Sequence, residues 1–149
     1  MHEKIVCCSG GMDPVHFGHI EYLEAAAKFG KLIVILNSDE WLIRKKGYNF
    51  MSFIERKKII EALRCVSSVV SVDDSDNTVC KALAQIRPDY FAKGGDRGKD
   101  NTPEVEQCGL LGIEMLFGIG GDDKVQASSR LVEQAIQSKL INRGIINGV

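Results

Sequence analysis

The sequence predicts an α/β domain built on a parallel β-sheet of about five strands, doubly wound, with helices on both faces. Two observations favour this fold class: apolar runs of strand length recur along the chain, and segments with helical spacing lie between them. We predict a single domain over residues 1–149. The tail at 138–149 has no strong pattern, so we expect it to pack loosely or against a partner subunit.

Five apolar runs have the length of β-strands. They are KIVCC (4–8), LIVILN (32–37), VVSV (69–72), DYFA (89–92) and IEMLFG (113–118). Because helical segments separate these runs, we expect mainly parallel strands joined by right-handed crossovers, as in Rossmann-like sheets.

Helical spacing and capping signals predict the helices. The segments are 19–30, 52–66, 78–89, 102–112 and 128–140. The first ends at Gly30, where a left-handed cap is expected. Ser52 with Glu55 fits a capping box at the start of the second, and Pro88 ends the third.

Composition and charge exclude several classes of protein. The chain is 44% hydrophobic with a formal net charge of -1, so we expect a surface that coats neither nucleic acid nor an anionic membrane. The N-terminus lacks a cationic leader and no run approaches the ~20 apolar residues of a membrane span, so a cytoplasmic protein is expected. The five cysteines lack CxxC spacing, which favours buried free thiols over disulfides.

The turn after the first predicted strand has the residues of a phosphate-binding site. The stretch SGGMDPVHFGH (9–19) places two glycines, an aspartate and two histidines where a strand leads into a helix. Ligands of doubly wound sheets bind at that edge. Backbone N–H groups of Gly10 and Gly11 can approach phosphates, and the helix start near Gly18 and His19 supplies a positive dipole.

Two common phosphate-binding motifs are absent from this turn. Neither a GxGxxG fingerprint nor a GxxxxGK P-loop occurs here or at GIGGDDK (118–124). His16, Phe17, Gly18 and His19 match the H-x-G-H signature of nucleotidyltransferases instead. Isolated histidine pairs are more often surface or core residues, and a zinc site with Asp13 or a cysteine is a further alternative, although the usual zinc spacing is missing.

Together with later blocks, this signature makes the chain resemble the cytidylyltransferase-like superfamily over about residues 4–137. The blocks are GGMDPVHFGH (10–19), NSDE (37–40), KKG (45–47), ERKKII (55–60), KGGD (93–96) and ASSR (127–130). The nucleotidyltransferase domain of bacterial ADP-heptose synthase is the most similar member, followed by glycerol-3-phosphate cytidylyltransferase. The chain departs from the usual pattern at Gly11, Met12 and Ala127, and Ala127 removes one possible phosphate or backbone contact.

The resemblance implies transfer of a nucleoside monophosphate from a nucleoside triphosphate to a phosphorylated sugar or polyol, with release of pyrophosphate. ATP with D-glycero-D-manno-heptose 1-phosphate, giving ADP-heptose, is the first expectation. CTP with glycerol 3-phosphate is the alternative, and a nucleotide-binding module without catalysis is an alternative of another class. Mg²⁺ is expected as cofactor, held mainly by the nucleotide phosphates and by no dedicated protein site. A homodimer is expected because related enzymes are commonly dimers.

Candidate roles follow from the same resemblance and from the charge that gathers on the transferred phosphate. His16, His19 and Lys46 are predicted to be catalytic, because positioned donors and cations stabilise that charge. Lys46 and Arg56 are predicted to bind the acceptor. The candidates for nucleotide binding are Gly10, Gly11, Met12, Asp13, Gly18, Gly94, Asp96, Ser128, Ser129 and Arg130.

Some of these assignments have structural alternatives. Asp13 can instead orient the turn, and Gly94 with Asp96 can form an ordinary capped turn. Lys46 is expected in a loop over 44–53 that folds over the ligand, and its alternative is a solvated lysine. Trp41 is expected to pack against neighbouring side chains and not to stack on a base.

Overall fold

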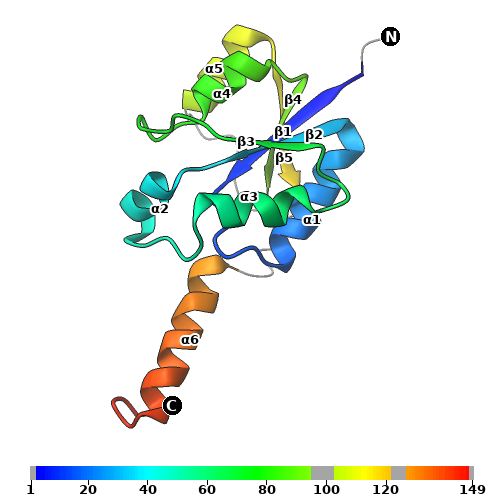
Figure 1. Ribbon diagram of the computed structural model, residues 1–149. Coiled ribbons are helices and arrows are strands. Elements are labelled where there is room, and N and C mark those ends of the chain that lie inside the picture. Colours follow the sequence, from blue (N-terminus) through cyan, green and yellow to red (C-terminus); the bar gives the residue numbers. More distant parts are fainter. Residues whose placement is uncertain (1–2, 95–102, 122–126, 148–149) are drawn as a thin grey trace.

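The structure is a computed structural model that describes residues 3–94, 103–121 and 127–147, and it confirms the predicted α/β fold (Figure 1). A five-stranded sheet has the order β3-β2-β1-β4-β5, and every neighbouring pair is parallel. The strands are β1 (Ile5–Gly10), β2 (Lys31–Leu36), β3 (Ser68–Val70), β4 (Tyr90–Gly94) and β5 (Glu114–Ile119). The order reverses beside β1, which places the first strand-to-helix turn at the edge where such sheets bind ligands.

Helices cover both faces of the sheet (Figure 1). They are α1 (Phe17–Ala26), extended by the 3₁₀ turn η1 (Ala27–Phe29), α2 (Asp39–Lys46), α3 (Phe53–Glu61), α4 (Cys80–Ile86), α5 (Pro103–Leu111) and α6 (Ser128–Asn142). Leu23 of α1 and Ile60 of α3 belong to one buried cluster, and Leu83 of α4 and Cys108 of α5 belong to another. The sheet therefore lies between an α1/α3 layer and an α4/α5 layer.

Side chains of β1 alternate between the two layers. Val6 and Cys8 lie in the cluster with α1 and α3, whereas Cys7 lies in the cluster with α4 and α5. All three are fully buried, as expected for a central parallel strand. Because β1 is packed on both sides, the turn that follows it starts from a rigid support.

Gly30 differs from the predicted left-handed cap. Its φ of 156° and ψ of -165° are close to extended backbone, and the end of α1 tightens into η1 instead. A Cβ atom at this position would lie 2.5 Å from the carbonyl oxygen of Lys4. The glycine is therefore required by the close approach of the chain before β1.

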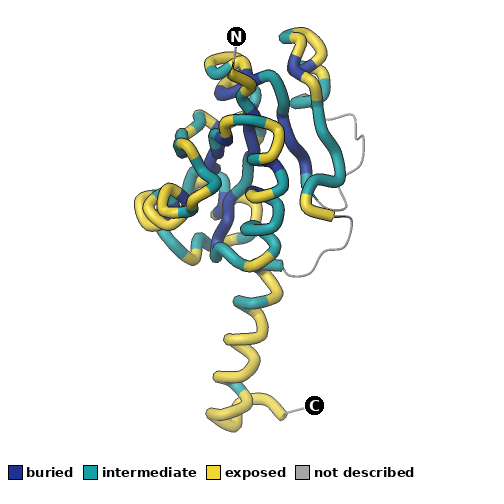
Figure 2. Tube along the Cα trace, turned by 90° about the vertical axis from the view of Figure 1, so that its right-hand side faces the viewer, coloured by how far each residue is buried: buried dark blue, intermediate teal, exposed yellow. Residues whose placement is uncertain are grey.

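Helix α6 projects away from the sheet and its covering helices (Figure 2). The segment from 138 onward, expected to be a loosely packed tail, continues α6 as far as Asn142, and residues 141–147 are exposed. Within the described parts of the chain, no helix has the length and apolar character needed to cross a membrane.

Candidate active site

A cavity of about 640 Å³ opens at the carboxyl ends of β1 and β4. Its walls come from the β1–α1 turn, α1, α2, β4 and the start of α6, which brings together residues far apart in the sequence. The predicted site residues that line it are Gly10, Gly11, Met12, His16, Gly18, His19, Lys46, Gly94, Ser128 and Ser129. Asp13, Arg56 and Arg130 are not among the lining residues, and Asp96 lies outside the described residues.

His16 and His19 start helix α1 through a reciprocal capping box. The backbone N–H of Gly18 donates to Nδ1 of His16 at 3.0 Å, and the backbone N–H of His16 donates to Nδ1 of His19 at 3.2 Å. Because Nδ1 is an acceptor in both rings, each neutral imidazole carries its proton on Nε2. Both side chains line the cavity, where an Nε2–H can donate to a phosphate oxygen.

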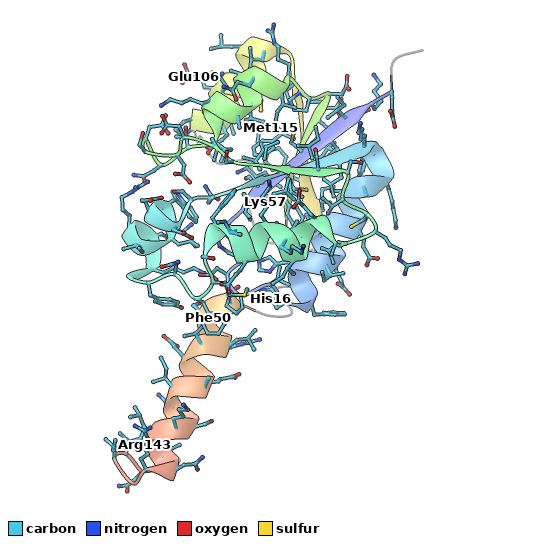
Figure 3. The ribbon with its side chains drawn as sticks, in the orientation of Figure 1. His16, Phe50, Lys57, Glu106, Met115 and Arg143 are labelled. Carbon is cyan, nitrogen blue, oxygen red and sulfur yellow. The ribbon has the colours of Figure 1, made fainter. Side chains whose placement is uncertain are left out.

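Helices α1 and α6 both begin at this cavity. His16 lies at the start of α1, at the edge of the domain from which α6 departs (Figure 3). Ser128 is mostly buried at the first position of α6, and its Oγ donates to the carbonyl oxygen of Pro14 at 2.7 Å. The N-terminal ends of α1 and α6 therefore converge, and both contribute positive dipole to a site for anions. Ser129 is exposed and lines the cavity, whereas Arg130 is exposed outside it.

Lys46 lies in the last turn of α2 and not in the predicted loop. The helix ends at Gly47, whose φ of 86° is left-handed, so the loop before Ser52 is shorter than expected. The Nζ of Lys46 is 3.4 Å from the backbone oxygen of Asp13. This helix end thus places the ammonium beside the β1–α1 turn without movement of a loop.

Asp13 orients the β1–α1 turn, which was the alternative to its predicted nucleotide contact. It is fully buried, and its carboxylate accepts hydrogen bonds from the backbone N–H groups of Phe50 at 2.5 Å and Met51 at 2.6 Å. A buried carboxylate needs such donors. These bonds tie the β1–α1 turn to the segment before α3, and the nucleotide contact of Asp13 stays a prediction.

Arg56 is buried as well and makes contacts within the protein, and its contact with the acceptor stays a prediction. Its guanidinium donates to the carbonyl oxygens of Gly11 at 2.8 Å, Asn37 at 2.9 Å and Met51 at 3.0 Å. It also donates to the carboxylate of Asp39 at 2.8 Å. Four of the five N–H groups of a guanidinium are engaged by these contacts.

A family model decides what kind of domain this is. The model described as Cytidylyltransferase-like matches residues 7–119, most of the chain. The chain belongs to the cytidylyltransferase-like family. The predicted resemblance is thereby confirmed, and with it the assignment to the nucleotidyltransferases.

Individual relatives of this cytidylyltransferase-like chain agree with the family assignment. It is 42% identical over 102 residues to the Bifunctional protein HldE of Blochmanniella floridana. That alignment covers 66% of this chain and 21% of the relative. The Bifunctional protein HldE of Pseudomonas aeruginosa is 35% identical over 144 residues, 95% of this chain and 28% of the relative. The chain therefore spans less than a third of the length of these relatives.

A solved structure has a similar fold. The crystal structure of the lipopolysaccharide core biosynthesis protein from Thermoplasma volcanium GSS1 matches with a TM-score of 0.68 and 26% sequence identity. The match covers 82% of this chain and 100% of that one. The likeness extends over the whole of the other protein.

Sequence reasoning missed several cavity residues of this cytidylyltransferase-like domain. Lys93 of β4 is 9% exposed and lines the cavity, with its Nζ 4.9 Å from the ring centroid of Phe91. The sequence contained one signal for this position: a lysine directly after the apolar run DYFA, at the start of the KGGD block. Trp41, which we expect to pack against neighbouring side chains and not to stack on a base, lines the cavity, and the Nζ of Lys45 lies 4.6 Å from the centroid of its ring.

Proposed function

We propose that this chain transfers a nucleoside monophosphate from a nucleoside triphosphate to a phosphorylated sugar or polyol and releases pyrophosphate. The observation that carries the proposal is the pair of histidines at the start of α1. Their Nδ1 atoms accept backbone N–H groups, so two Nε2–H donors belong to one cavity. Donors fixed in place before the reaction stabilise developing charge without reorganisation.

The proposed reaction is a direct displacement at the α-phosphorus. A phosphate oxygen of the acceptor forms the new P–O bond while the bond to the β-phosphate breaks, and pyrophosphate carries away the electron pair. His16 and His19 donate to the α-phosphate oxygens as charge gathers there, and Lys46 supplies a cation from α2. The starts of α1 and α6 hold the remaining phosphate oxygens. No covalent enzyme intermediate is required.

Mg²⁺ is the proposed cofactor, and its ligands would be mainly phosphate oxygens. Within residues 3–94, 103–121 and 127–147, no three His, Cys, Asp or Glu side chains are grouped to hold a metal ion. Mg²⁺ is commonly bound through substrate phosphates and a few waters. The metal would neutralise charge on the triphosphate, while His16, His19 and Lys46 would position the triphosphate.

ATP with D-glycero-D-manno-heptose 1-phosphate is the first choice of substrates, with ADP-heptose as product. Two observations favour it: the KGGD and NSDE blocks resemble the nucleotidyltransferase domain of ADP-heptose synthase, and a neighbour with 26% identity is named a lipopolysaccharide core biosynthesis protein. CTP with glycerol 3-phosphate is the second choice.

Pyrophosphate release tests this proposal directly. The purified chain is incubated with Mg²⁺ and either ATP or CTP, together with heptose 1-phosphate, glycerol 3-phosphate or a control sugar phosphate. Release that requires ATP and heptose 1-phosphate is expected. Release with CTP and glycerol 3-phosphate would favour the second choice. Nucleotide binding by calorimetry without release for any pair would show a binding module instead of an enzyme.

A homodimer is part of the same proposal. The projecting helix α6 carries Val132, Ile136 and Leu140 at a spacing that places them on one face, and Ile136 is 53% exposed. Such a face can be covered by a second copy. Sedimentation equilibrium is expected to show a dimer for the wild type and a monomer for Ile136→Asp. A wild-type monomer would exclude this arrangement.

A further inference from the structure

Arg56 links four segments that surround the candidate active site. Gly11 lies in the β1–α1 turn, Asn37 follows β2, Asp39 is in the first turn of α2, and Met51 precedes α3. One guanidinium contacts all four, at distances between 2.8 and 3.0 Å. No single backbone hydrogen bond could hold so many segments together.

The segment before α3 is held from two sides. The carboxylate of Asp13 accepts the N–H of Met51, and Nε of Arg56 donates to the carbonyl oxygen of the same residue. Asp13 belongs to the β1–α1 turn, and its backbone oxygen is also the group that lies 3.4 Å from Nζ of Lys46. The positions of the turn, of this segment and of Lys46 are therefore coupled through Asp13 and Arg56.

We infer that Arg56 is a positioning residue that sets the distance between Lys46 and the histidine-bearing turn, an inference that rests on the proposed function. Arg56 itself is 1% exposed and does not line the cavity, so it acts through the residues that it holds. A lysine would keep the charge but not the planar fork, so it could not reach the same four acceptors. Small displacements of catalytic groups reduce turnover strongly.

Arg56→Lys is the test variant, with Asp39→Asn as a milder second variant that removes the counter-charge and keeps an oxygen acceptor. The control is Arg64→Lys, an exposed arginine beyond the end of α3. At a temperature where all variants are folded, Arg56→Lys is expected to lower kcat by roughly 10- to 100-fold while the Kd for ATP changes by less than about threefold. Asp39→Asn should lower kcat less, and Arg64→Lys should not change it.

A spectroscopic measurement separates this inference from the proposed function. Trp41, the one tryptophan of the chain, lies in α2 between Asp39 and Lys46, so its quenching by acrylamide reports how α2 is held. Quenching is expected to rise in Arg56→Lys and to stay unchanged in Arg64→Lys. A folded Arg56→Lys protein with wild-type quenching or wild-type kcat would overturn the inference. If the wild type turns over no substrate, the proposed function fails, and quenching still decides whether Arg56 positions α2.

Discussion

The imidazole rings of His16 and His19 stack with their centroids 3.9 Å apart and an angle of 25° between their planes. The same two residues form the capping box of α1 through their Nδ1 atoms. One pair of side chains thus begins the helix and fixes the tautomer that the proposed transfer needs. Replacing a histidine removes both contributions unless the substitute retains the cap.

His16→Asn is expected to separate the two contributions. Asparagine is a favoured N-cap, so its side-chain oxygen can accept the N–H of Gly18, whereas His16→Ala should lower the free energy of unfolding by ~1 kcal/mol. Both variants lack the Nε2–H donor and should lower kcat by about 10²–10⁴-fold. Thermal unfolding and pyrophosphate release measure the two effects. Wild-type turnover in His16→Asn would remove His16 from the mechanism.

Lys46→Ala is expected to affect chemistry more than binding. If the ammonium acts on charge that develops during transfer, kcat should fall by about 10²-fold or more, with the Kd of the nucleotide within about threefold. Lys58→Ala, which removes an exposed lysine of α3, is the matched control. Steady-state kinetics and calorimetry give the two quantities, and a weaker Kd with unchanged kcat would indicate that Lys46 only binds substrate.

Gly120 is expected to tolerate no side chain. Its φ is 88°, and a Cβ atom there would lie 2.9 Å from Cα of Tyr22 in α1. Gly120→Ala should therefore lower the free energy of unfolding by about 1–3 kcal/mol. At Gly109, inside α5, an added Cβ would meet no atom within 4 Å, so Gly109→Ala should raise this free energy by about 0.5–1 kcal/mol. Urea unfolding of both variants checks the contrast, and a stable Gly120→Ala protein would contradict it.

The buried thiols predict a loss of stability at alkaline pH. Burial raises the pKa of Cys7 and of Cys8 from 9.0 to about 12, and that of Cys108 to about 11. The folded state thus holds these protons more tightly than the unfolded state, so the stabilisation is complete below pH about 9 and is lost as pH rises toward the folded pKa values. Urea unfolding between pH about 8 and 10.5 should show this decline. A Cys8→Ala protein should decline less steeply, and equal slopes would contradict the assignment.

Local patterns of the sequence predicted the five strands and the helices α1, α3, α4, α5 and α6 in their order along the chain, as well as the turn where the site lies. The capping box of Ser52 and Glu55 is present as predicted, because its partners are three positions apart. The H-x-G-H signature likewise placed His16 and His19 at the start of a helix beyond the carboxyl end of β1. These features depend on neighbours along the chain, so the sequence alone contains them.

Only the tertiary structure decided which polar residues face the cavity and which support it. Asp13 pairs with Met51, 38 positions away, and Arg56 pairs with Gly11, 45 positions away. Both were expected to touch substrate, yet each is buried. Backbone N–H groups satisfy Asp13, and backbone carbonyl oxygens together with the Asp39 carboxylate satisfy Arg56. Conversely, Lys93 lies within the buried strand β4 and lines the cavity. A side chain's residue type shows what it can bind, but its partners are set by how distant segments pack, and packing leaves no local pattern in the sequence.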